Sequence, residues 1–155
     1  MNEFTKTRTL RFIRRASPVF PEHRPLYKIA QILLILELAS RGGKSSLPRL
    51  QLMNWALKTE ERRAKLIESV KNGQLKLAAW GFDPVVAIAL RFAEAENLVY
   101  QVSTGYQISE IGKKFARDIC RNTENLESER SFLSALGKAL TEAMVSEVSD
   151  KWGES

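Results

Sequence analysis

A chain of 155 residues with 44% hydrophobic content can build one domain with an ordinary core, and leaves little room for a second. No stretch reaches the ~18 continuous apolar residues of a membrane span, and the basic amino terminus lacks a signal-peptide apolar region, so we expect a cytoplasmic protein. A single cysteine, Cys120, excludes an internal disulfide, and with only one histidine, His23, it argues against a Cys/His zinc site.

The net charge of +6 is distributed unevenly along the chain. Residues 1–28 carry +5 and residues 41–76 carry +6, whereas residues 77–155 carry −4. Such asymmetry predicts a basic surface that attracts nucleic acid or an acidic protein, although a solvated basic face would have the same composition.

Residues 1–25 are expected to form an extended basic arm, because Pro18, Pro21 and Pro25 interrupt any helix. We expect this arm to become ordered on a partner. The segment after it, LYKIAQILLILELA from Leu26 to Ala39, is apolar on nearly all sides, which predicts a helix buried in the middle of the domain. The glycines that follow mark its end.

Two further helices are predicted from their start signals. Ser46 followed by Pro48 begins one, and Thr59 with two acids after it begins the next. Residues 74–77 are a candidate short strand. Asp83 followed by Pro84 is a strong start signal for a helix that runs to about Asn97.

The stretch LVYQVSTGYQIS, residues 98–109, alternates in polarity around a Ser-Thr-Gly turn and predicts a β-hairpin. Gly105 stands where a three-residue turn needs a left-handed residue. Ser109 is expected to cap another helix. A last helix is predicted from Leu126 to Val148, because its leucines recur at helical spacing.

This order of elements predicts a mostly α-helical fold with a small β-hairpin, a winged helix-turn-helix-like domain with an inserted helix and a C-terminal helix. We expect three parts: the basic extended arm at 1–25, the winged-helix-like domain at 26–122, and the C-terminal helix at 123–155, packed on the domain or on a partner.

The helix before the hairpin has the wrong chemistry for reading DNA. Winged-helix DNA readers place this helix in the major groove and need polar or basic side chains on its first turns. Here those turns are Val85 to Leu90, and the hairpin turn at 103–105 carries no cation. This pattern favours packing against protein over reading a base sequence.

Catalytic signatures are weak throughout. Gly43-Lys44-Ser45 matches the end of the phosphate-binding loop motif, but the glycine that should begin the motif falls at Leu38. The segment also follows a predicted helix, whereas that motif follows a strand. Glu60 and Glu61 point in different directions on a helix. We therefore expect no enzyme activity and no cofactor.

A resemblance adds to this interpretation. It rests on two stretches of the sequence. The first is residues 27–66, YKIAQILLILELASRGGKSSLPRLQLMNWALKTEERRAKL, with its buried first helix and Leu52–Trp55 pattern. The second is residues 82–116, FDPVVAIALRFAEAENLVYQVSTGYQISEIGKKFA. Together they resemble the small middle components of bacterial three-component ABC systems. Those proteins are encoded beside a large SMC- or Rad50-like ATPase in anti-phage and anti-plasmid loci related to Lamassu. The resemblance implies a non-enzymatic subunit that binds the ATPase and an effector, and it supplies no catalytic residue.

Two functions follow. The first is an interaction module, with an apolar helix before the hairpin and a C-terminal helix that also offers a route to oligomers. Its candidate docking residues are Val85, Val86, Leu133, Leu140 and Met144. The alternative is a winged-helix DNA-binding transcriptional regulator that contacts phosphates without reading sequence. The candidate contacts to phosphate or to an acidic partner are Lys6, Arg8, Arg11, Arg14, Arg15, Arg49, Lys58, Arg62, Arg63 and Lys65.

Overall fold

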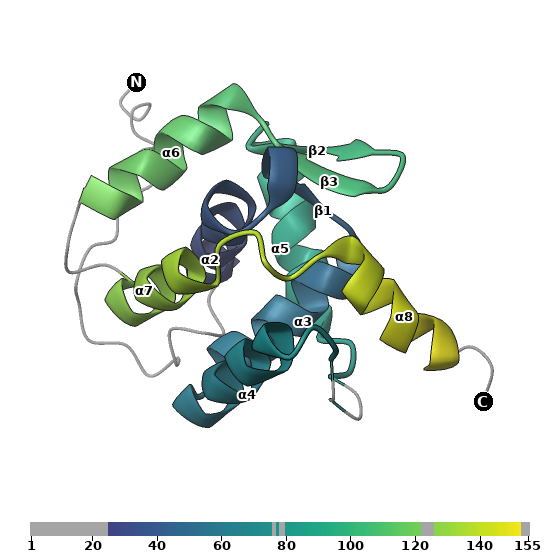
Figure 1. Cartoon of the computed structure of the whole chain (residues 1–155). Coiled ribbons are helices and arrows are strands. Elements are labelled where there is room, and N and C mark those ends of the chain that lie inside the picture. The colour runs from purple at the N-terminus through teal and green to yellow at the C-terminus, as the bar shows by residue number, and fades with distance from the viewer. Residues whose placement is uncertain (1–24, 76, 78–79, 122–125, 153–155) are drawn as a thin grey trace, which may run out of the picture.

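The computed structural model describes the backbone of residues 25–75, 77, 80–121 and 126–152 (Figure 1). This part of the chain is mostly helical and contains a small three-stranded antiparallel sheet. The expected basic arm, apart from Pro25, lies outside the described residues. In chain order the elements are α2 (Pro25–Leu38), η2 (Arg41–Gly43), β1 (Lys44–Ser45), α3 (Leu47–Leu57), α4 (Glu60–Lys71), α5 (Pro84–Ala95), β2 (Val99–Val102), β3 (Gly105–Ile108), α6 (Glu110–Arg121), α7 (Glu127–Leu136) and α8 (Glu142–Trp152).

Helix α2 is the centre of the structure, as its sequence predicted. It packs against α3, α5, α6, α7 and β3, and Figure 1 shows it surrounded by those elements. Every side chain from Ile29 to Leu36 is buried, including Gln31. Full burial contributes roughly 1.5–3 kcal/mol for each large aliphatic side chain, so α3, α5, α6 and α7 are assembled on α2, while α4 and α8 pack on α3.

Four helix starts are confirmed by side-chain caps that accept a backbone N–H. The caps are Ser46 from Arg49 (3.3 Å), Thr59 from Arg62 (3.1 Å), Asp83 from Val85 (3.0 Å) and Ser109 from Gly112 (3.0 Å). Each cap satisfies one of the N–H groups that a first turn leaves without a partner in the helix, which stabilises it by ~1 kcal/mol.

The hairpin is confirmed, but its turn differs from the prediction. Val102 pairs with Gly105, so the turn has two residues, Ser103 and Thr104, and not three. The sequence also gave no sign of β1, where Ser45 pairs with Tyr106. A Cβ atom on Gly105 would lie 2.1 Å from the Ser45 carbonyl oxygen, so the close approach of β1 requires glycine there.

The predicted single C-terminal helix is two helices. Gly137, with a φ of 57°, lies just after α7, and the chain turns through residues 137–141 before α8 begins. Helix α7 packs against α2 and α8 packs against α3. Leu133 and Leu136 of α7, Leu140 of the connection and Val145 of α8 are buried in the core, so the apolar stripe serves the fold of this chain.

The connection between α4 and α5 contains the candidate strand predicted from the sequence. No strand forms at Gln74, Leu75 or Leu77, and Lys76 lies outside the described residues, so the candidate strand at 74–77 is not observed where the backbone is described. Trp80 anchors this connection instead, because its indole Nε1–H donates to the Pro48 carbonyl at 3.1 Å.

Among the described helices, none has the length and apolar character to cross a membrane.

Candidate interaction surface

The outer face of α5 exposes large apolar side chains. Its inner side, with Val86 and Leu90, is buried towards α2. Ile88 and Phe92, four residues apart and on the opposite side, are 46% and 51% exposed. Residues at i and i+4 lie next to each other on a helix, so the two form one apolar patch. Val85 lies on the same side and is half-buried.

This placement corrects the docking residues expected from the sequence. Val86, Leu133 and Leu140 are buried in the core, where no partner can reach them. Val85 and Met144 are half-buried, and Met144 packs against the core. The sequence reasoning missed Ile88 and Phe92. Helical spacing could have identified both, because they face away from the side that carries Val86, Leu90 and Ala93.

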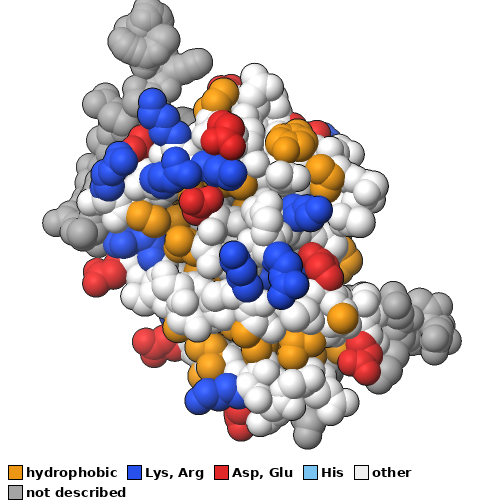
Figure 2. All heavy atoms as spheres, turned by 45° about the horizontal axis from the view of Figure 1, so that its top comes forward, with side chains coloured by type: hydrophobic (Ala, Val, Ile, Leu, Met, Phe, Trp, Pro, Cys, Tyr) orange, Lys and Arg blue, Asp and Glu red, His pale blue; other side chains and the backbone are white. Residues whose placement is uncertain are grey.

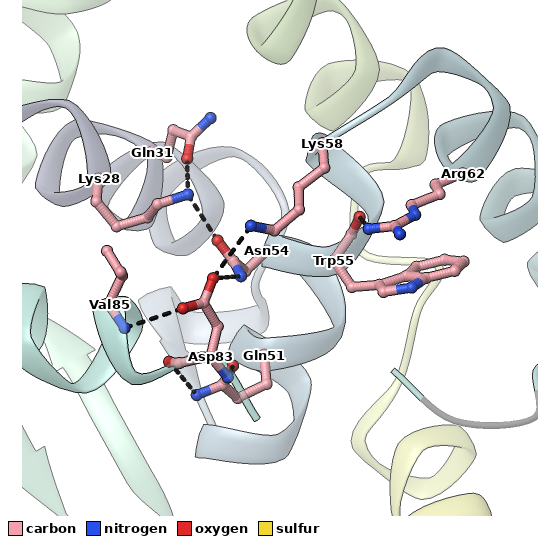
Figure 3. Close-up of polar contacts among 9 residues, drawn as sticks. All are labelled: Lys28, Gln31, Gln51, Asn54, Trp55, Lys58, Arg62, Asp83 and Val85. Atoms are coloured by element: carbon pink, nitrogen blue, oxygen red, sulfur yellow. Dashed lines mark hydrogen bonds and ion pairs between the residues drawn. The ribbon is translucent and has the colours of Figure 1, made fainter. Parts of the chain in front are cut away.

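A polar network holds the start of α5 in place (Figure 3). The Asp83 carboxylate accepts from the Val85 N–H at 3.0 Å, from Asn54 Nδ2 at 3.1 Å and from Lys58 Nζ at 3.1 Å. Burial by itself would raise the pKa of Asp83, but these donors and the Lys58 charge together lower the pKa below its usual value. The ionised carboxylate therefore fixes α5 to α3.

The same network continues into the core. Asn54 Oδ1 accepts from the buried Lys28 ammonium at 2.6 Å, and Gln31 Oε1 accepts from it at 2.7 Å. Gln51 bonds twice to the backbone of Asp83, donating to its carbonyl at 3.2 Å and accepting from its N–H at 2.9 Å. Helices α2, α3 and α5 are thus joined by side chains that specify one arrangement, and the α5 patch sits on a fixed base.

Arg49 is not a surface cation, contrary to the sequence expectation. Its side chain is 2% exposed. Its Nε–H donates to the Leu140 carbonyl at 2.9 Å, Nη1 donates to Ser40 Oγ at 2.8 Å, and Nη2 donates to the Ala39 carbonyl. Burial lowers the pKa of Arg49, and the Glu142 carboxylate partly opposes that shift. The residue ties the end of α2 to the connection between α7 and α8.

The other candidate basic residues do not lie free on one face. Lys58 pairs with Asp83 at 3.1 Å. Arg62 lies over the Trp55 ring, 5.0 Å from its centroid, and Arg63 Nη1 donates to the Leu57 carbonyl at 2.9 Å. Only Lys65 of this group is exposed without such a contact in the described part of the chain. The expected continuous phosphate-binding face of α3 and α4 is therefore broken up by contacts within the fold.

The remaining candidates, Lys6, Arg8, Arg11, Arg14 and Arg15, lie outside the described residues. On the face that carries the hairpin and α6, Figure 2 shows lysine and arginine side chains with acidic side chains between them. Helix α6 has this mixture in its ion pairs, Lys113 with Glu110 and Arg121 with Asp118. Mixed charges of this kind give a weaker attraction for phosphate than a basic stripe would.

Chemical groups suited to catalysis are not brought together among the described residues. No three His, Cys, Asp or Glu side chains there lie close enough to hold a metal ion. Cys120 is half-buried, and burial raises the pKa of its thiol, which keeps it from acting as a ready nucleophile.

Comparisons of the chain with protein families, with curated proteins and with solved structures find no match.

Proposed function

We propose that the protein is a non-enzymatic accessory subunit that docks on a larger protein through the outer face of α5. The observation that supports it is the exposure of Ile88 and Phe92 on a helix whose base is fixed by the Asp83 network. Large apolar side chains that are held in place and left in water are typical of a surface that a protein partner covers. Covering the patch contributes ~25 cal/mol for each Å² of apolar area removed from water.

The fold we propose is a winged helix with an inserted helix. Strand β1 follows α2 and pairs with β3, and α5 precedes the hairpin, as in that architecture. The insertion is α4. In DNA readers of this fold, the helix before the hairpin presents base-contacting polar groups. The outer face of α5 presents Ile88, Phe92 and a single cation, Arg91, so it suits a protein partner better than a DNA groove.

The partner we propose is the SMC- or Rad50-like ATPase of a bacterial anti-phage or anti-plasmid system related to Lamassu, with an effector as a further partner. Support comes from the resemblance of residues 27–66 and 82–116 to the middle components of such systems. A gene for a large ATPase beside the gene for this chain would strengthen the assignment. An isolated gene with an upstream palindrome would favour the transcriptional regulator.

The test is co-expression with the ATPase encoded next to this chain, followed by size-exclusion chromatography. We expect the two proteins to elute together and the variant Ile88→Glu/Phe92→Glu to elute alone, because two carboxylates cannot be buried in an apolar interface. Ile111→Glu is the matched control, since Ile111 is 58% exposed on α6 and outside the patch. Circular dichroism of each free variant checks that it is folded.

Two results would reject the proposal. One is co-elution of the double variant to the same extent as wild type. The other is nanomolar binding of the free protein to one DNA duplex and not to an unrelated one, which would establish the regulator instead.

A further inference from the structure

A pocket of about 260 Å³ lies between the hairpin turn, β1 and the connection from α7 to α8. None of its lining residues comes from α5, so it is separate from the proposed docking face. The residues that line it are Arg41, Lys44, Ser45, Arg49, Thr104, Lys138, Leu140, Thr141 and Glu142. They come from parts of the sequence that are up to about 100 residues apart, and only folding brings them together.

The pocket contains four cations and one carboxylate. Arg41, Lys44 and Lys138 are exposed, and within the part of the chain that the structure describes their side chains make no ion pair or hydrogen bond. Like charges gathered around one hollow give it a positive potential that attracts an anion.

The one carboxylate in the pocket is already engaged. Glu142 Oε2 accepts from the Ser46 backbone N–H at 2.9 Å, at the amino-terminal end of α3. It also acts on the buried Arg49, whose pKa it raises against the larger effect of burial. Glu142 therefore offsets one of the four charges, and the pocket remains positive.

Hydrogen-bond donors are also available. Arg49 uses one N–H on each of its three nitrogens, which leaves one proton on Nη1 and one on Nη2 without a partner in the described residues. Thr141 Oγ1 accepts from the Met144 N–H at 3.1 Å, so its own proton remains free to donate. Cations with hydroxyl donors between them match the oxygens of a tetrahedral anion.

We propose that this pocket binds a phosphate group carried as a monoester. A carboxylate ligand would bring one negative charge, whereas a phosphate monoester brings close to two and offers three oxygens to the surrounding donors. The volume is below the ~300 Å³ at which pockets for whole small molecules begin, so it fits the phosphate and its nearest atoms, with the rest of the ligand outside. The source is either a free mononucleotide or the 5′-terminal phosphate of a nucleic acid, since both are monoesters.

The probes are inorganic phosphate, adenosine monophosphate and a 12-base-pair duplex with 5′-terminal phosphates, each titrated at low salt into the full-length, ¹⁵N-labelled protein. We expect all three to shift the backbone amide signals of Thr104 and Thr141. The variant Lys44→Gln/Lys138→Gln should weaken each affinity by ~10-fold or more, because two charge-assisted contacts are lost. The control Lys71→Gln/Lys114→Gln removes two exposed lysines outside the pocket and should change affinity by less than ~2-fold for phosphate and the nucleotide.

The relative affinities identify the source of the phosphate. Tighter binding of the nucleotide than of the duplex assigns a mononucleotide, and the reverse assigns the terminal phosphate of a nucleic acid. The inference is overturned if none of the probes binds at low salt. It is also overturned if the pocket variant and the control lose affinity equally, because the contribution of the lysines would then be a general effect of net charge.

Discussion

The fold brings together two groups of charged side chains, and they differ in how completely the chain itself satisfies them. Around Asp83, the carboxylate, the Lys58 ammonium and the amides of Asn54 and Gln51 are each bonded to one another or to backbone. Around Arg49, one engaged carboxylate faces four cations. The charges around Asp83 are neutralised by the fold and have a structural role. The exposed cations of the pocket, Arg41, Lys44 and Lys138, are surplus cations, and their charge is available to a ligand.

The largest expected effect comes from removing Arg49, the buried cation that both supports the fold and lines the pocket. Arg49→Met should lower the free energy of unfolding by about 3–5 kcal/mol, because the Ala39 and Leu140 carbonyls and the Ser40 hydroxyl lose their shared donor. Urea denaturation at pH 7 measures it. Arg41→Met, an exposed neighbour in the same pocket, should change stability by less than ~0.5 kcal/mol. Equal losses in the two variants would contradict the distinction between structural and surplus cations.

The Asp83 network should show the next largest effect. Asn54→Leu removes an acceptor from the buried Lys28 ammonium and a donor from Asp83, and we expect a loss of about 2–3 kcal/mol. The same denaturation experiment on Asn72→Leu, at the exposed end of α4, should show a change within ~0.5 kcal/mol. A loss below ~1 kcal/mol for Asn54→Leu would mean that the network does not stabilise the junction of α2, α3 and α5.

Asp83→Asn should have a smaller and pH-dependent effect. Asparagine keeps a capping oxygen but loses the charge that pairs with Lys58, so we expect a loss of ~0.5–1 kcal/mol at pH 7. The pKa of Asp83 is lowered in the folded state, so its contribution is fully present above the unfolded value of ~3.9 and is lost as the pH falls through the folded value. The difference between wild type and variant should therefore shrink between pH 7 and pH 2.5. A constant difference would contradict the ionic role.

The sequence predicted the structural group better than the surplus group. Ser46, Thr59, Asp83 and Ser109 each mark a predicted helix start that the structure confirms, because a helix start is recognised from its immediate neighbours in the chain. The all-apolar character of α2 likewise predicted its central position.

Features that depend on distant segments were missed. Strand β1 has two residues and exists only because β3 lies beside it, and Gly137 divides a helix whose leucine spacing is continuous. The pocket joins residues near positions 41–49, 104 and 138–142, and no local pattern indicates that these segments meet. Burial of Arg49 has the same origin, since its acceptors include Leu140 from the far end of the chain.

The smallest expected effect on stability is also the sharpest test of the comparison. Lys44→Gln/Lys138→Gln should leave the free energy of unfolding within ~0.5 kcal/mol of wild type, because neither lysine has a bonding partner to lose in the described structure. Added phosphate should then separate the two proteins. A ligand at ten times its dissociation constant stabilises the folded state by about 1.4 kcal/mol, so the melting temperature of wild type should rise with phosphate and that of the variant should rise less. Chloride at matched ionic strength controls for screening. An equal rise in both proteins would show that the surplus cations hold no anion, and that they differ from the Asp83 group only in being exposed.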